Sequence, residues 1–482
     1  MKKYLQQYNN APVQVKASLW FLICSFLQKC IQMITTPIFT RLLNTSEYGE
    51  FNVYNSWLAI VSVFVSLNLY AGVFTKGLVK YEEDKNVFSS SMLGLCTTCN
   101  IIGFCIYILF KNFFNHLFGL STFKMVLMFV SIWASSAFSF WSAYQRVEFK
   151  YKALVFVTVI NSIIKPVCSI IFVVNASDKV TARILAIALI DVISFGGLYL
   201  SQMCKGKKIY QSRYWKYAIR FSIPLVPHYL SMIVLSSSDR IMIERMVGAD
   251  VAGIYSLAYS ISQIVAIFNT ALFSTVEPWL YKKLKENRTD DIGKVAYITL
   301  IIIAGVIFVL IAFAPEVVMI FAPLEYREAI WVIPPVAMSV YFVFAYTFFA
   351  VIEFHYDKTK YISYATMLGA ILNIVLNYIF IGLVGYMAAG YTTLICYVVY
   401  AVAHYMFSQK ICNEKMNGIK IYDLRILATI TMSFVIIGFV IMATYKKILL
   451  RYTIIGISFV LFVVMRKKIV MTLKKLLNLR KI

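Results

Sequence analysis

The sequence predicts an all-α polytopic membrane protein with about fourteen transmembrane helices. Three observations support this fold class: 61% of the 482 residues are hydrophobic, only 14% are charged, and the mean hydropathy is +0.76. A soluble domain is nearer half apolar, with about a quarter of its residues charged. One helical span needs about 20 apolar residues, so fourteen spans would use roughly 280. The remainder suffices for connections but leaves no room for a folded extramembrane domain.

Apolar windows, separated by polar or basic connections, define the individual spans. In order along the chain, the expected spans are residues 17–40, 50–74, 88–110, 124–144, 153–174, 181–203, 219–243, 252–276, 295–319, 329–353, 362–381, 384–407, 425–445 and 452–466. The eleventh and twelfth lie close together, and the last is short. The first sixteen residues are polar and contain no signal-peptide core.

Basic residues indicate the orientation of the spans. With both termini in the cytoplasm, Lys and Arg concentrate on the inner connections, such as 205–220 and 282–294. The inner side then has roughly a threefold excess of basic residues, as the positive-inside rule predicts. The net charge of +24 therefore reflects membrane topology rather than nucleic-acid binding. Cys96 and Cys99 form a C-x-x-C inside the third span, but the sequence offers no second pair for a metal site.

A weak internal repeat suggests duplication. Shifting the chain by 204 residues aligns Gly49 with Gly253, among other matches in the same order. We therefore predict a six-helix N-terminal lobe (1–204), a six-helix C-terminal lobe (205–409), and two added helices with a basic cytoplasmic tail (410–482). Parallel repeats of this kind are related by an axis along the membrane normal, and transporter substrate sites tend to lie where such repeats meet.

Several motifs resemble one family of membrane proteins. The residues that carry the resemblance are 37–43 (PIFTRLL), 47–49 (EYG), 220–228 (RFSIPLVPH), 238–243 (SDRIMI), 252–259 (AGIYSLAY), 372–377 (LNIVLN) and 385–390 (GYMAAG). In this order they resemble the first-to-second, seventh-to-eighth and eleventh-to-twelfth helices of polysaccharide repeat-unit flippases. The last motif is looser, because Tyr386 and Met387 stand where small residues are usual.

The resemblance implies a function. Members of this family belong to the multidrug, oligosaccharidyl-lipid and polysaccharide exporter superfamily. They move undecaprenyl-diphosphate-linked O-antigen or capsule units from the inner to the outer face of the bacterial cytoplasmic membrane. By resemblance we expect the partners to be membrane lipids, a lipid-linked oligosaccharide and polysaccharide polymerase or ligase machinery. We expect no cofactor.

Such a substrate needs cationic groups for its diphosphate. Lys29 lies halfway along the first span, where an ammonium is costly unless it faces a cavity or a partner. Lys165 precedes Pro166 in the fifth span, where a kink could orient it. Arg240 is a further candidate contact. Arg41 and Arg245 are repeat mates near the outer ends of their spans, where interfacial anchoring is equally expected.

Other polar residues within spans could bind sugars or carry coupling ions. Asn373 and Asn377 suit sugar hydroxyls, although polar residues also join helices to one another. Asp239, Asp191 and Glu353 are the candidate ion-coupling groups; Asp239 could instead pair with Lys29. Pro224 and Pro227 are expected hinge positions in the seventh helix.

Three alternatives remain open. A multidrug exporter of the same superfamily would need an acidic or apolar cavity, against which Lys29 and Lys165 argue. A peptidoglycan-precursor flippase shares the topology and the lipid diphosphate. A sugar polymerase or glycosyltransferase is a different class, but the outer loops are too short to hold a catalytic domain. We therefore predict that the protein is not an enzyme. No G-x-x-x-x-G-K-[ST] loop occurs, which excludes an ATP-driven pump within this chain.

Overall fold

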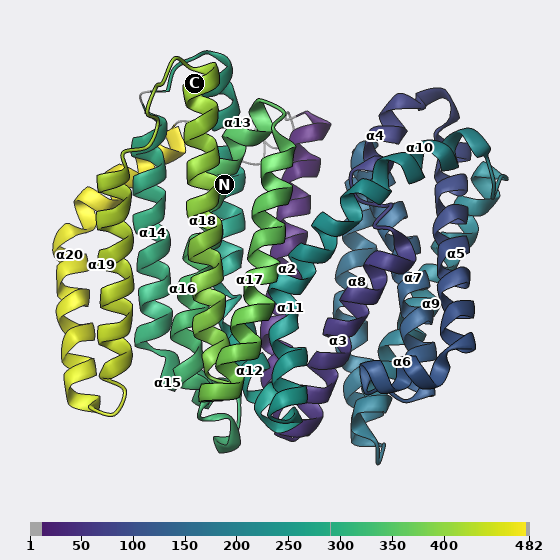
Figure 1. Cartoon of the computed structure of the whole chain (residues 1–482), viewed down its shortest axis with the longest axis horizontal. Helices are drawn as coiled ribbons and strands as arrows, with labels where there is room; N and C mark the ends of the chain where they lie inside the picture. Colours follow the sequence, from purple (N-terminus) through teal and green to yellow (C-terminus); the bar gives the residue numbers. More distant parts are fainter. Residues whose placement is uncertain (1–11, 290, 479–482) are drawn as a thin grey trace, which may run out of the picture. The chain divides into compact units, whose positions relative to one another are not determined.

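The computed structural model describes residues 12–289 and 291–478, and all regular elements in these ranges are helices (Figure 1). The all-α polytopic prediction is confirmed. The predicted cytoplasmic residues Lys2, Lys3, Arg480 and Lys481 lie outside the described residues. The chain divides into two compact units, Met1–Glu244 and Arg245–Ile482.

The first unit contains long helices with short ones between them. Its elements are α2 (Val13–Leu42), α3 (Thr45–Ser66), α4 (Val73–Lys80), η1 (Glu82–Asp84), α5 (Lys85–Leu109), α6 (Lys111–Phe118), α7 (Thr122–Val147), α8 (Tyr151–Val174), α9 (Lys179–Gly206), α10 (Ser212–Ser222), η2 (Ile223–Leu225) and most of α11 (Val226–Met246). Helix α9 packs against α5, α7 and α8, and α2 packs on α8.

The second unit is organised around one buried helix. Its elements are α12 (Ala249–Ser262), α13 (Val265–Lys285), α14 (Ile292–Ala312), α15 (Ala314–Phe321), η3 (Leu324–Tyr326), α16 (Ala329–His355), α17 (Thr359–Val384), α18 (Ala388–Lys415), α19 (Leu424–Ala443) and α20 (Ile448–Asn478). Helix α16 contacts α12, α13, α14, α15, α17, α18 and α19. In its most apolar stretch, 83% of the residues are buried.

Within the described residues, eleven helices are long and apolar enough to cross a bilayer. The other three expected spans coincide with α3, α18 and α20. The predicted span 50–74 is interrupted, because α3 ends at Ser66 and Leu67 and Asn68 take left-handed backbone angles (φ 49° and 48°). The expected span 219–243 contains the 3₁₀ segment η2, which includes the predicted hinge residue Pro224, between α10 and α11.

Side-chain caps define where several helices begin. Asn44 accepts from the Glu47 amide while Glu47 accepts from the Asn44 amide, which forms a capping box for α3. Ser121 caps α7 and Asp178 caps α9. Burial alone would raise the pKa of Asp178, but hydrogen bonds from Thr181 and Val180 and the charge of Lys124 together lower that pKa below its ordinary value.

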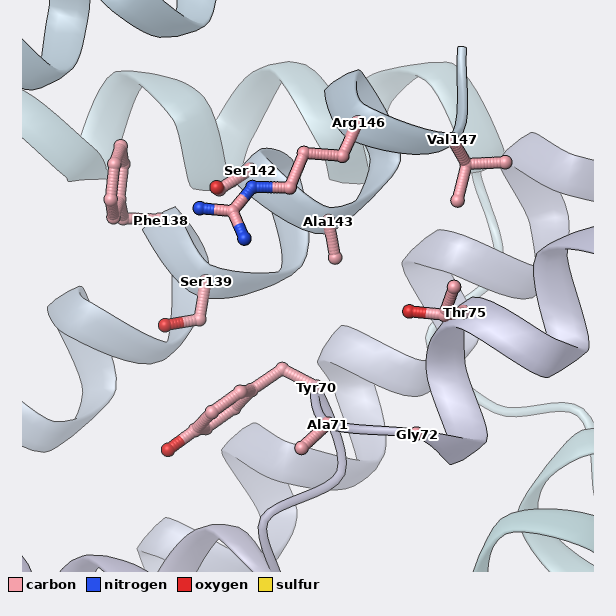
Figure 2. A pocket seen from close by; sticks show the side chains of 10 residues that line it. All are labelled: Tyr70, Ala71, Gly72, Thr75, Phe138, Ser139, Ser142, Ala143, Arg146 and Val147. Carbon is pink, nitrogen blue, oxygen red and sulfur yellow. The ribbon is translucent and has the colours of Figure 1, made fainter. Parts of the chain in front are cut away.

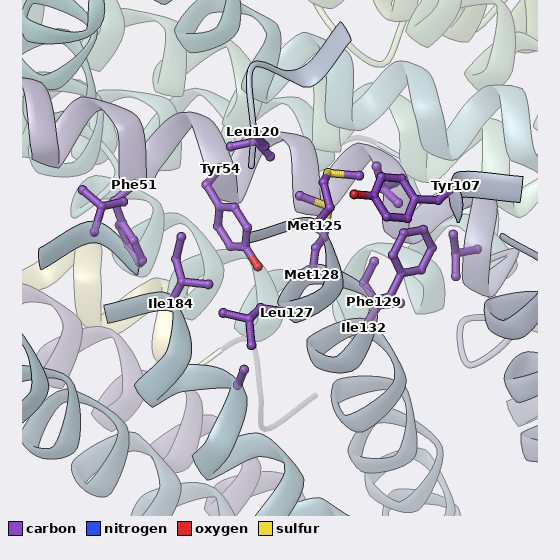
Figure 3. Close-up of a cluster of buried hydrophobic side chains, with 14 residues drawn as sticks. Phe51, Tyr54, Tyr107, Leu120, Met125, Leu127, Met128, Phe129, Ile132 and Ile184 are labelled. Carbon is purple, nitrogen blue, oxygen red and sulfur yellow. The ribbon is translucent and has the colours of Figure 1, made fainter. Parts of the chain in front are cut away.

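Two apolar clusters hold the first unit together. One joins α3, α5, α7 and α9 through residues such as Tyr54, Met128 and Phe129 (Figure 3). The other joins α4, α5, α7 and α10 around Phe88 and Phe140. The second cluster, which includes Leu69 and Phe74, packs α4 and the preceding turn against α7.

Candidate functional site

Two charged residues predicted for different roles come together in the first unit. The Nζ of Lys165 on α8 forms an ion pair with Oδ1 of Asp191 on α9, and lies 5.1 Å from the centre of the Phe195 ring. The Asp191 side chain is 5% exposed and that of Lys165 is 30% exposed. Pairing lowers the cost of both charges inside a membrane. The sequence indicated both residues but not their pairing, because they lie on different helices.

The predicted basic residues of α2 have different surroundings. Lys29 is exposed and forms no ion pair with any described residue. Arg41 is also exposed, and its Nη1 donates to the Pro37 carbonyl oxygen in the same helix at 2.8 Å. Lys29 is therefore the predicted cation with most freedom to meet an anion.

The predicted residues of α11 are adjacent but differently buried. Asp239 is 1% exposed, whereas Arg240 is partly exposed and its Nη1 lies 3.5 Å from the Ser236 carbonyl oxygen. Arg245 is exposed and is the first residue of the second unit.

The two predicted asparagines form a polar contact between helices in the second unit. Asn373 and Asn377 of α17 are fully buried, and Nδ2 of Asn377 donates to Oδ1 of Asn373 at 3.3 Å. The hydroxyl of Thr392 on α18 donates to Oδ1 of Asn377. In this conformation the pair joins α17 to α18.

A buried acid–base pair lies between α16 and α18. Oε1 of Glu353 is 2.7 Å from Nδ1 of His404, and both residues are fully buried. Tyr346 stacks on the imidazole at 5.2 Å and Tyr400 meets it edge-on at 4.5 Å. Oε2 of Glu353 and Nε2 of His404 have no hydrogen-bond partner among the described residues. A pair of this kind can share one proton. The sequence indicated Glu353 but not His404, whose only sign was a histidine inside an apolar run.

A cavity of about 570 Å³ lies in the first unit, between α7 and the turn that precedes α4. Figure 2 shows Arg146, Ser142 and Ser139 on one side and Tyr70 and Gly72 on the other. Arg146 follows the expected span 124–144, on the side predicted to face the cytoplasm, and no sequence pattern indicates that it would line a cavity. The cavity itself requires the turn at residues 67–72, which no apolar window shows.

The fold defines an all-α polytopic membrane protein whose long apolar helices contain several buried charged and polar groups. Residues 15–284, more than half of the chain, match the family described as polysaccharide biosynthesis protein. The chain belongs to this family.

Two relatives come from Haemophilus influenzae (strain ATCC 51907 / DSM 11121 / KW20 / Rd). An uncharacterized membrane protein is 22% identical over 366 residues, covering 74% of this chain and 88% of that protein. The Lsg locus putative protein 1 is 23% identical over 284 residues, covering 57% and 67%.

Solved structures share the fold. The lipid II flippase MurJ in an inward closed conformation has a TM-score of 0.62 and 13% identity, with 90% of this chain and 99% of that chain covered. An outward-facing MATE multidrug transporter of the MOP superfamily has a TM-score of 0.56 and 14% identity, with 84% and 96% covered.

Proposed function

We propose that this protein is a flippase that moves undecaprenyl-diphosphate-linked oligosaccharides, such as O-antigen or capsule units, across the bacterial cytoplasmic membrane by alternating access. The observation that carries the proposal is the match to the polysaccharide biosynthesis family over residues 15–284. The fold in common with a lipid II flippase supports transport rather than synthesis of the saccharide. Polysaccharide polymerase or ligase machinery would act on the delivered product.

Basic side chains within the spans suit an anionic headgroup. Lys29, exposed and without an ion pair among the described residues, would meet the diphosphate, with Arg41, Arg240 and Arg245 as further contacts. Lys165 would bind the diphosphate once its ion pair with Asp191 is replaced by a contact with a phosphate oxygen. Asn373 and Asn377 would reach sugar hydroxyls only in a conformation that separates α17 from α18.

The membrane potential would assist this movement. It contributes about 2.3 kcal/mol per elementary charge per 100 mV. A headgroup with two negative charges would gain about twice that on leaving the negative interior. Asp191, Asp239 and the Glu353–His404 pair are the groups through which a coupling ion would add to this driving force.

The direct test is translocation in reconstituted vesicles. The probe is a fluorescent undecaprenyl-diphosphate oligosaccharide, and the signal is the fraction that becomes accessible on the far side. We expect Lys29→Ala to slow translocation about tenfold or more, because a charge-assisted hydrogen bond contributes about 1.5–3 kcal/mol. Lys29→Arg should retain most activity, and Gln28→Ala, an exposed neighbour on α2, should retain all of it.

Failure of the wild-type protein to move any lipid-linked oligosaccharide, with and without an imposed potential, would refute the proposal. The second candidate is a peptidoglycan-precursor flippase, which the fold shared with MurJ favours. Lipid II as the probe in the same vesicles separates the two: preferential movement of lipid II would favour the second candidate.

Glu353 and His404 allow a test of ion coupling. His404→Phe preserves the aromatic packing with Tyr346 and Tyr400 but removes the partner of Glu353. If the pair carries a coupling proton, this variant loses the response of translocation to an imposed pH gradient while its response to membrane potential is retained. An unchanged response to the pH gradient would exclude the pair from coupling.

A further inference from the structure

The cavity in the first unit has a composition that none of the other sites shares. Its lining combines one guanidinium, from Arg146, with hydroxyl groups from Ser139, Ser142 and Thr75 and the ring of Tyr70. The guanidinium extends over the cavity toward Ser142 and Ser139 (Figure 2). The cavity volume of about 570 Å³ lies within the range of small-ligand sites.

The positive charge of Arg146 is not neutralised within the described part of the chain. Arg146 forms no ion pair there, and its one ring contact is with Phe21, 5.8 Å from the ring centre. The carboxylate nearest in sequence, Glu148, is held by Lys85 at 2.7 Å and by Lys150 at 3.8 Å. A guanidinium that faces a cavity without a carboxylate is suited to bidentate binding of phosphate oxygens.

The backbone at the opposite wall adds to this positive potential. Gly72, with φ +66°, is the N-cap of α4, and no side chain caps that helix. Gly72 and Thr75 both line the cavity, so the first turn of α4 borders it. The N-terminal end of a helix carries a partial positive charge that favours an anion.

The lining of the cavity extends along α7 far enough for a ligand with two parts. Phe138 and Val147 lie nine helical steps apart on α7, or about 13 Å along the helix axis. Arg146 lies at the end predicted to face the cytoplasm, while Ser139 and Phe138 lie deeper in the span. Serine hydroxyls and aromatic faces are the groups that bind sugars, and the arginine is the group that binds phosphate.

We propose that this cavity is the cytoplasmic loading site for the substrate headgroup, in which Arg146 binds the diphosphate of a lipid-linked saccharide and the deeper wall receives its first sugar. This inference rests on the proposed function, since it assigns the substrate of that function to a particular place. The basic residues Lys29, Lys165 and Arg240 of the same unit do not line this cavity.

Binding to the full-length protein in detergent micelles tests this assignment. The probe is a diphosphate-linked disaccharide on a ten-carbon isoprenoid chain, measured by titration calorimetry. We expect Arg146→Ala to weaken its affinity about 10- to 100-fold, as loss of a charge-assisted bidentate contact requires. Arg146→Lys should recover part of that loss. Ala143→Leu, which keeps the arginine but fills the cavity, should also weaken binding.

The matched control is Arg213→Ala. Arg213 is an exposed arginine of the same unit and the same predicted membrane side, and it does not line the cavity. The Arg213→Ala variant should bind the probe with the affinity of the wild type. All variants should be monodisperse with an unchanged melting temperature. Arg146→Ala with wild-type affinity would overturn the inference, while translocation by the wild-type protein would leave the proposed function intact.

Two further arms identify the ligand chemistry. The same disaccharide lipid without its diphosphate should bind no better to the wild type than to Arg146→Ala. Phosphatidylglycerol, added to the micelles in excess, should not displace the probe. Displacement would make the cavity a general phospholipid site and overturn the assignment. Tight Arg146-dependent binding by a protein that translocates no lipid-linked saccharide would refute the proposed function but retain the anion site.

Discussion

Removing either member of the Lys165–Asp191 pair should have unequal effects. Lys165→Met leaves a carboxylate whose side chain is 5% exposed without its cation, while Asp191→Asn leaves an ammonium that is 30% exposed. Breaking a buried ion pair costs about 3–5 kcal/mol when the remaining charge stays buried. We therefore expect Lys165→Met to lower the free energy of unfolding by about 3–5 kcal/mol. Asp191→Asn should lower it by about 1–2 kcal/mol, since the ammonium can reach water or lipid headgroups and the amide oxygen still accepts.

The double variant Lys165→Met/Asp191→Asn completes a thermodynamic cycle. Because both replacements are uncharged, it leaves no buried charge and should be more stable than Lys165→Met alone, and close to the wild type. The assay is denaturant titration of the purified protein in mixed lipid–detergent micelles. Equal losses for the two single variants, or a double variant that shows the sum of the two losses, would refute the argument from unequal burial. Vesicle translocation by the double variant then separates a structural pair from a substrate-exchanging one.

Two further predictions concern contacts between helices. Gly206→Ala should destabilise the first unit by about 1–3 kcal/mol, because the added Cβ would clash with the backbone oxygen of Asn86. The control is Gly197→Ala on the same helix. A Cβ there meets nothing within 4 Å, so this variant should be neutral or slightly stabilising. Equal melting temperatures for the two variants would contradict the packing argument. Thr392→Val should cost about 0.6–1.7 kcal/mol, because it removes the hydroxyl donor to the buried Asn377. An unfolding curve that coincides with that of the wild type would show that this contact does not stabilise the pair of helices.

Much of the fold could be predicted from the sequence because the membrane imposes one length scale on every span. Apolar windows of about 20 residues therefore coincide with long helices such as α5, α8 and α14. The break after Ser66 was missed, since it depends on the left-handed backbone of Leu67 and Asn68 inside an otherwise apolar run. Hydropathy is insensitive to backbone conformation.

The sites were predictable as residues but not as arrangements. A charge within a span is conspicuous in any sequence, so Lys165, Asp191 and Glu353 were identified. Their partners depend on the rotation of one helix against another, which is set by packing and not by composition. For that reason the sequence named Glu353 without His404, and assigned Lys165 and Asp191 to separate roles.

The burial of α16 on nearly all sides changes which substitutions the second unit can tolerate. In a bilayer, moving an apolar side chain from lipid into protein gains little, because hydrocarbon tails are as apolar as leucine. The fit of residues such as Ala337, Met338 and Phe348 against the surrounding helices must therefore supply the stabilisation. Exchanges that preserve hydrophobicity but alter shape should be as damaging along α16 as polar ones, whereas lipid-facing positions of α17 should accept any apolar residue. Sequence variation in this family should accordingly be limited by side-chain volume along α16 and only by hydropathy along the lipid-facing positions of α17.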